Sequence, residues 1–238
     1  MILERERLES GVEVLRLNRP ERRNAFDSAL LAEMNEALDS LVDDPELAVL
    51  VLSSTSSRAL SAGADVAEDL DAEGGVARME AFARMYAQVS AFPVPTVGVC
   101  VGHCVGAGAE IAAACDLRVA GDNMKARWVG SLHGVPVGPA RLAPLVGETL
   151  AKDLIFTSRV MEVEEALRIG FVRSIHPPDD AEAAALELAA SLAERPVAGL
   201  RRMKQLFLTL GDGPARVAHE NDELVDFQRH GSGLPRRG

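Results

Sequence analysis

The 238-residue sequence contains no long run of hydrophobic residues. A helix needs about 18 consecutive, mostly apolar residues to cross a bilayer, so we expect no membrane-spanning segment and no membrane partner. The first residues, 1–9, alternate between apolar and charged side chains and resemble neither a signal peptide nor a transit peptide. We therefore expect a cytoplasmic protein.

Positive charge is also scarce. The chain has 25 Lys and Arg against 36 Asp and Glu, which gives a net charge of −11. Proteins that bind nucleic acids rely on clustered positive charge to neutralise phosphates, so we expect no nucleic-acid partner. A few local arginines and backbone amides can still bind an anionic small molecule on an acidic protein.

Cysteine is rare: the chain has three, an odd number, and they are Cys100, Cys104 and Cys115. They lie in apolar surroundings without paired histidines, a context typical of buried thiols rather than of a disulfide or a metal site. Disorder is excluded by composition, because 47% of the residues are hydrophobic and 26% are charged, as in ordinary globular proteins.

The first two thirds of the chain alternate between strand and helix patterns. A hairpin is expected at the start, followed by a helix that Asp27 or Ser28 caps. The expected strands cover residues 1–8, 12–17, 47–52, 96–101 and 116–120. Helical stretches separate the later strands, one ending near Phe92 and one running through Ala114. This alternation predicts the α/β fold class with crossover connections.

The last third is mainly helical, and no repeat of the solenoid type is visible. The expected helices cover residues 139–146, 148–157, 163–169, 179–193, 196–210 and 214–227, with a short strand at 171–175. The final residues, 230–238, resemble a frayed end. A single core followed by a helical C-terminal region explains this pattern.

Two turns rich in small residues are candidates for chemistry, Ser61–Asp65 and Gly102–Glu110. Each follows an expected strand and precedes an expected helix, where small residues permit close approach of a ligand and the first amides lack partners. Amides from two such turns can stabilise negative charge on one oxygen. Each turn taken alone also fits a simple packing role, and Glu110 then only complements a helix dipole.

Four segments, in this order, resemble motifs of the crotonase (enoyl-CoA hydratase/isomerase) superfamily. They are Asn18-Arg-Pro-Glu-Arg-Arg-Asn-Ala-Phe26, Leu60-Ser-Ala-Gly-Ala-Asp65, Gly102-x-x-x-Gly-x-Gly-x-Glu110 and Cys115-Asp-Leu-Arg118. The resemblance implies a crotonase-like spiral of repeated ββα units over residues 1–195, followed by a shortened helical trimerisation region over 196–238. It also implies an acyl-CoA thioester substrate, a homotrimer or dimer of trimers, and no cofactor or metal beyond the CoA of the substrate.

By motif position, the resemblance assigns the two oxyanion amides to Ala64 and Ala107 and the proton-transfer role to Glu110. The residues that it places along the CoA substrate are Arg22, Arg23, Ala25, Ala62, Asp65, Val66 and Gly106. Ala107 departs from the family, which usually has glycine there. An alanine still donates its amide, but its Cβ narrows the expected acyl pocket.

Hydratases of this family use a second glutamate further along the chain, and Val129 takes its place here. Valine cannot exchange protons, so His133 or His103 is a candidate substitute, because histidine titrates near neutrality. A lone histidine is more often a surface or core residue. The family's C-terminal ending is also absent, so we expect a more open pocket.

Several functions therefore stay open. Hydration is the reaction that the resemblance favours, while Val129 leaves isomerisation, decarboxylation or hydrolysis as alternatives. A non-catalytic acyl-CoA-binding protein is a second hypothesis. An RNA-binding relative is disfavoured by the charge of −11, and a peptidase is disfavoured because no nucleophilic serine motif is visible.

Overall fold

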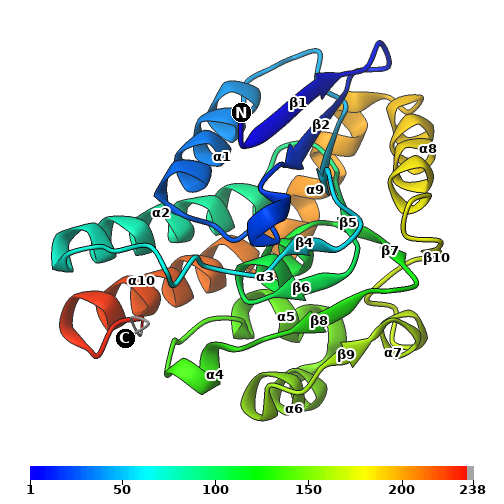
Figure 1. Cartoon of the computed structure of the whole chain (residues 1–238). Helices are drawn as coiled ribbons and strands as arrows, with labels where there is room; N and C mark the ends of the chain where they lie inside the picture. The colour runs from blue at the N-terminus through cyan, green and yellow to red at the C-terminus, as the bar shows by residue number, and fades with distance from the viewer. Residues whose placement is uncertain (235–238) are drawn as a thin grey trace.

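The computed structural model describes residues 1–234 of the chain (Figure 1). Its largest sheet has the order β1-β2-β3-β5-β7-β10, antiparallel between β1 and β2 and parallel elsewhere. These strands are Leu3–Arg7, Val12–Leu17, Val49–Ser54, Thr96–Cys100, Leu117–Gly121 and Ile175–His176. The expected hairpin is thus confirmed, whereas the strand expected at 171–175 begins only at Ile175.

A second, four-stranded sheet has the order β4-β6-β8-β9. Its strands are Ala59–Ser61, His103–Val105, Lys125–Arg127 and Met161–Glu162. The chain passes from a strand of the large sheet to one of the small sheet and then into a helix, as in β3, β4 and α2, or β5, β6 and α3. This repeated ββα unit confirms the predicted α/β spiral. The short strands of the second sheet lie in segments that the sequence pattern assigned to loops and turns.

The helices of the chain follow the sequence pattern closely after residue 138. They are α1 Ser28–Leu41, α2 Ala72–Ser90, α3 Ala107–Ala114, α4 Gly130–His133, α5 Pro139–Val146, α6 Glu148–Thr157, α7 Val163–Arg168, α8 Ala181–Ala193, α9 Val197–Leu210 and α10 Gly213–His230. Asp27 caps α1, because its side chain accepts a hydrogen bond from the amide of Leu30 at 2.9 Å. No helix within residues 1–234 is long and apolar enough to cross a membrane.

The core has two parts, one on each face of the large sheet. Valines of β2, β3, β5 and β7 pack against α8 on one face, and larger side chains pack against α1 and α2 on the other. Burial on both faces explains why the central strands are continuous apolar runs. All three cysteines are buried and free, as expected.

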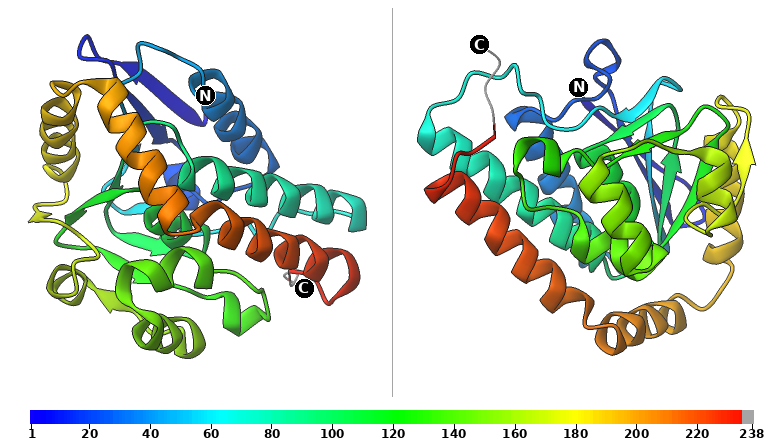
Figure 2. Two further views of the ribbon diagram at one scale, coloured as in Figure 1. Left: turned by 180° about the vertical axis from the view of Figure 1, so that it is seen from behind. Right: turned by 90° about the horizontal axis from the view of Figure 1, so that it is seen from below.

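The C-terminal helices fold back over the body of the same chain. Figures 1 and 2 show α10 lying alongside α2, with α9 leading from α8 across the back of the molecule. Residues 231–234 form neither helix nor strand, and the rest of the segment expected to fray, 235–238, lies outside the described residues. Leu224 of α10 and Leu234 both line the candidate site described next, so the end of α10 lies close to it.

Candidate active site

The two small-residue turns meet at one cavity of about 320 Å³. Ala64 comes from the first turn and Ala107 from the second, and both belong to its wall. Helix α2 and the segment from Val129 to Val137, which includes α4, supply most of the apolar remainder, and α10 contributes Leu224. The cavity is lined by Ala62, Gly63, Ala64, Val66, Met79, Phe82, Tyr86, Val105, Gly106, Ala107, Arg127, Val129, Gly130, Leu132, His133, Val135, Val137, Leu224 and Leu234.

Parallel pairing of β4 with β6 brings the turns together, because both turns leave the same edge of the small sheet. Gly63 and Gly106 have φ angles of +98° and +51°, which favour glycine. A Cβ on Gly63 would lie 3.6 Å from the amide nitrogen of Ala107, so the two backbones are in direct contact. The amides of Ala64 and Ala107 donate no hydrogen bond to any group within residues 1–234, so both are available to a ligand.

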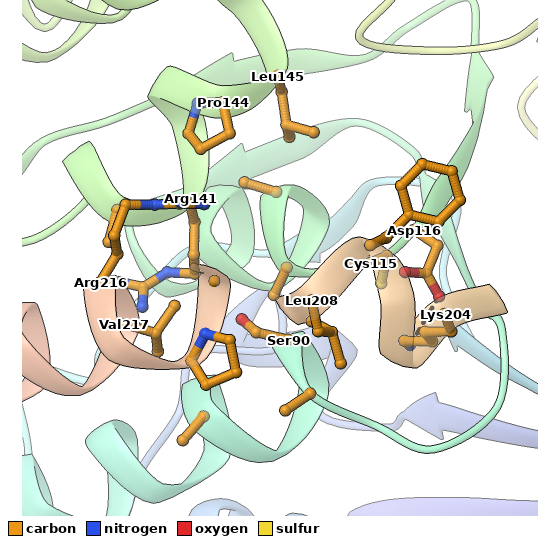
Figure 3. Close-up of a pocket in the computed structure, with 18 of the residues that line it drawn as sticks. Ser90, Cys115, Asp116, Arg141, Pro144, Leu145, Lys204, Leu208, Arg216 and Val217 are labelled. Carbon is orange, nitrogen blue, oxygen red and sulfur yellow. Dashed lines mark hydrogen bonds and ion pairs between the residues drawn. The ribbon is translucent and has the colours of Figure 1, made fainter. Parts of the chain in front are cut away.

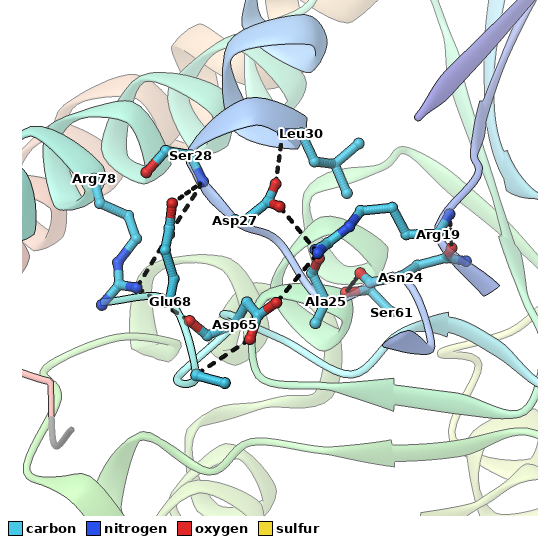
Figure 4. Close-up of polar contacts among 11 residues, drawn as sticks. Arg19, Asn24, Ala25, Asp27, Ser28, Leu30, Ser61, Asp65, Glu68 and Arg78 are labelled. Carbon is cyan, nitrogen blue, oxygen red and sulfur yellow. Dashed lines mark hydrogen bonds and ion pairs between the residues drawn. The ribbon is translucent and has the colours of Figure 1, made fainter. Parts of the chain in front are cut away.

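The first turn is held by hydrogen bonds, and the expected helix does not begin there. Asp65 donates its amide to the carbonyl of Phe26 at 2.8 Å, and Arg19 bridges the carboxylates of Asp27 and Asp65 at 3.0 and 3.3 Å (Figure 4). The helix α2 starts only at Ala72. The amide of Ala64 is thus unpaired within a turn. The prediction that this turn opens a helix was wrong.

Glu110 lies one turn along α3 from Ala107 and is almost fully buried. Its Oε2 accepts a hydrogen bond from Nε of Arg141 at 2.8 Å, and both side chains are 1% exposed. No donor to Oε1 is found in the described part of the chain. Gly138, with φ +117°, leaves room for this arrangement, because a Cβ there would lie 3.1 Å from Oε1. Glu110 thus lies behind the cavity wall, close to Val137 and Tyr86.

Burial controls the protonation of this carboxyl group. The pKa of Glu110 is raised to about 7, mainly by desolvation; Arg141 opposes this rise, and the nearby charge of Glu220 adds to it. Tyr86 packs against Arg141, the partner of Glu110, with its ring centre 4.4 Å from the guanidinium carbon. A carboxyl with a pKa of about 7 can both accept and return a proton at neutral pH.

The segment around α4 contributes no carboxylate to the described lining of the cavity. Val129 lines the cavity there together with Leu132 and Val135. His133 reaches the rim from α4 and is exposed, so of the two candidate histidines it is the one that lines the acyl cavity. His103 lines a different, basic pocket, where burial and the positive charges of Arg23 and Lys125 lower its pKa.

The residues predicted to lie along CoA are distributed over several places. Ala62, Val66 and Gly106 line the acyl cavity. Arg23 instead lines a separate pocket of about 300 Å³ with Arg58, His103 and Lys125. Of the other candidates, Arg22 is exposed, Ala25 is buried and Asp65 is bound to Arg19.

This basic pocket adjoins the acyl cavity along the small sheet. His103 and Val105 are two residues apart on β6, and Lys125 and Arg127 are two residues apart on β8, so each pair shares a face of the sheet. The first member of each pair lines the basic pocket and the second lines the cavity.

Three residues around Glu110 had no signal in the sequence: Tyr86, Arg141 and Glu220. They come from α2, α5 and α10, far apart in the chain, and each looks like an ordinary helical residue. The C-terminal region also contributes more than expected, because Leu224 and Leu234 belong to the cavity wall. The C-terminal region therefore helps to close this pocket.

A larger cavity of about 610 Å³ lies between α9, α10 and the ends of α2 and α5 (Figure 3). Its lining is mainly apolar and includes Leu145, Leu208 and Val217. None of the residues predicted from the sequence to act in catalysis or CoA binding lines it. Arg141 lies at its edge, next to Arg216 of α10 (Figure 3).

Comparison with known families gives a match over nearly the whole chain. Residues 7–228 match the model of the family described as enoyl-CoA hydratase/isomerase. A short-chain-enoyl-CoA hydratase of Clostridium acetobutylicum is 32% identical over 216 residues, which covers 86% of this chain and 79% of that protein. A 2,3-dehydroadipyl-CoA hydratase of Escherichia coli is 30% identical over 195 residues, 81% of this chain and 76% of that protein.

Solved structures show the same fold. An enoyl-CoA hydratase/isomerase from Xanthobacter autotrophicus superposes with a TM-score of 0.87 and 24% identity, covering 99% of this chain and 89% of the other. An enoyl-CoA hydratase from Bacillus anthracis superposes with a TM-score of 0.83 and 24% identity, covering 94% and 91%.

Proposed function

Because the chain belongs to the enoyl-CoA hydratase/isomerase family of the crotonase superfamily, we propose that it acts on an acyl-CoA thioester through a stabilised enolate. The observation that carries this proposal is the meeting of two unpaired amides, those of Ala64 and Ala107, at one cavity. Both would donate to the thioester oxygen as negative charge develops there. A donor of this kind contributes about 3–4 kcal/mol to the transition state.

Glu110 is the proton-transfer residue in this proposal. When the C–H bond next to the carbonyl breaks, its electron pair moves into the enolate and the proton passes to the carboxylate; protonation of the enolate is the reverse. The pKa of about 7 and the absence of a donor to Oε1 among the described residues support this role. Glu110 must gain access to the cavity past Tyr86 and Val137 during turnover.

A spectrophotometric screen of enoyl-, hydroxyacyl- and malonyl-type CoA thioesters tests the reaction. We expect turnover of at least one class by the wild type and a fall in kcat of about 10²–10⁴-fold in Glu110→Gln, since this is the usual contribution of a general acid or base. Glu164→Gln, an exposed site on α7, is the matched control. Full activity of Glu110→Gln would contradict the role of Glu110.

The second candidate function is a non-catalytic acyl-CoA-binding protein. The valine at position 129 in the cavity wall and the nearly complete burial of Glu110 favour it. Calorimetry that finds tight binding of CoA thioesters, with no turnover across the screen, would select this candidate over the enzyme.

The basic pocket around Arg23 is our proposed site for the phosphates of CoA. The guanidinium groups of Arg23 and Arg58 have no acidic partner within the described residues, and no acidic side chain lines this pocket. We expect Arg58→Gln to raise KM for an acyl-CoA by about two- to fivefold, as for an exposed ion pair, and to leave KM for the matching acyl-pantetheine unchanged. Arg173→Gln, at another exposed site, is the control. Equal effects on both substrates would contradict this placement.

The assembly and the compartment are also proposals. We propose a homotrimer or dimer of trimers in the cytoplasm, in line with the family. Exposed apolar side chains on α9 support an assembly, and they are Met203, Leu206, Phe207 and Leu210. Sedimentation equilibrium that gives the mass of a single chain would reject it.

A further inference from the structure

Two carboxylates from distant parts of the chain share one buried guanidinium. Glu110 of α3 accepts a hydrogen bond from Nε of Arg141, and Glu220 of α10 accepts one from Nη2. The exposed fractions of these three side chains are 1%, 1% and 9%. Arg141 itself lies on α5, so the cluster ties three helices together.

The charges in this cluster do not balance. Two ionised carboxylates and one guanidinium would leave a net charge of −1 in a place with almost no solvent, and burial of an uncompensated charge is costly. Retention of one proton by either carboxyl group removes this charge. Tyr86 of α2 adds no charge at neutral pH, because burial raises its pKa. Arg216 of α10 lies next to Arg141 but makes no ion pair with either carboxylate within the described residues.

The hydrogen bonds distinguish the two carboxyl groups. Glu220 accepts from Arg141 through Oε1 and from the backbone amide of Ala140 through Oε2, at 2.6 Å. Glu110 accepts only from Arg141 within the described residues, and it is more deeply buried. Hydrogen bonds to the charged form favour ionisation. Glu220 is therefore the ionised partner and Glu110 the partner that exchanges a proton.

We propose that Glu220 is a positioning residue for the reaction. It shares Arg141 with Glu110 and thereby holds the carboxyl group of Glu110 between its protonated and ionised states. This inference rests on the proposed role of Glu110. It places the second acidic residue of the site on the C-terminal helix, behind the first, while Val129 occupies the position of the family's second glutamate. Glu220 would act through Arg141 and would not touch the substrate.

Replacement of Glu220 by glutamine tests the proposal. The substitution removes one negative charge and leaves a balanced pair of Glu110 and Arg141, so the variant should fold. A nearby like charge raises a carboxyl pKa, so the titration midpoint of Glu110 should fall by about 1 pH unit when that charge is removed. The midpoint is measured by ¹³C NMR of labelled glutamate carboxyls, with the Glu110 signal assigned by its loss in Glu110→Gln. The acid limb of the kcat–pH profile should move in parallel.

Two further variants separate charge from structure. Glu220→Asp keeps the negative charge and should return the midpoint towards the wild-type value, whereas Glu223→Gln removes a charge from an exposed site on the same helix and should not move it. An unmoved midpoint in Glu220→Gln would reject this inference alone. A fully active Glu110→Gln enzyme would reject the proposed role of Glu110, and this inference with it.

Discussion

The two walls of the acyl cavity differ sharply in charge. Behind one wall lie Glu110, Arg141 and Glu220, joined by hydrogen bonds and hidden from solvent. The other wall presents Val129, Leu132 and Val135, with His133 only at the exposed rim. Proton exchange is therefore expected from one side of a bound acyl group.

The charged side is also the side on which most elements converge. Helix α3 places Glu110 one turn from the Ala107 amide, while α5 and α10 supply its partners. The apolar side is formed by one short helix, α4, and the segments around it. A change to the charged side should thus affect both folding and catalysis, and a change to the apolar side should affect catalysis alone.

The largest expected effect comes from removing the shared cation. Arg141→Gln leaves two carboxyl groups buried without their common partner, which should lower the free energy of unfolding by about 3–5 kcal/mol. Urea denaturation followed by circular dichroism measures this loss. Arg84→Gln breaks an exposed pair with Asp39, and there the loss should stay within about 1 kcal/mol. Similar losses in the two variants would show that the buried cluster contributes no more than a surface pair.

Adding a carboxylate to the apolar wall should make the two walls more alike. We expect Val129→Glu to raise the rate of water addition to an enoyl-CoA by about tenfold or more, because it supplies a second acid–base group in the cavity wall. Val129→Gln has the same shape without the charge and serves as the control. If both variants hydrate no faster than the wild type, the identity of residue 129 does not limit hydration.

The smallest expected effect is on stability as a function of pH. The pKa of Glu110 is raised in the folded chain to about 7 from an ordinary value of 4.5. The folded state thus holds its proton more tightly, so this contribution to stability is complete below pH 4.5 and is lost as the pH rises through 7. Between pH 6 and 7, where this contribution falls by about 1 kcal/mol, Tm should fall by about 2–4 °C more in the wild type than in Glu110→Gln. Parallel Tm curves would show that Glu110 titrates alike in the folded and unfolded chains.

Much of the architecture was predictable because it depends on local patterns. Pro139–Val146 and Glu148–Thr157 match their expected helices, since apolar spacing and flanking glycines are local signals. The strands Ala59–Ser61 and His103–Val105 were not expected, because three residues are too few for a periodic pattern. Their pairing with each other is what brings the two turns together.

The candidate site, too, was only partly predictable from the sequence. Ala62, Ala64, Val66, Gly106 and Ala107 were named from motifs, and all five line one cavity. No motif marked Arg141 or Glu220, because their importance comes only from the carboxylate that they surround. Arg23 was expected beside CoA, and its side chain lines the basic pocket that we propose for the CoA phosphates; no sequence pattern specifies that direction.

By itself, the sequence determined the family, the strands of the large sheet, most of the helices and the two turns with their small residues, because each of these depends on residues close together in the chain. The tertiary structure decided which groups surround Glu110 and how its proton is held. Burial and charge act through space, and the side chains that determine them around Glu110 come from helices as far apart in the sequence as α2 and α10.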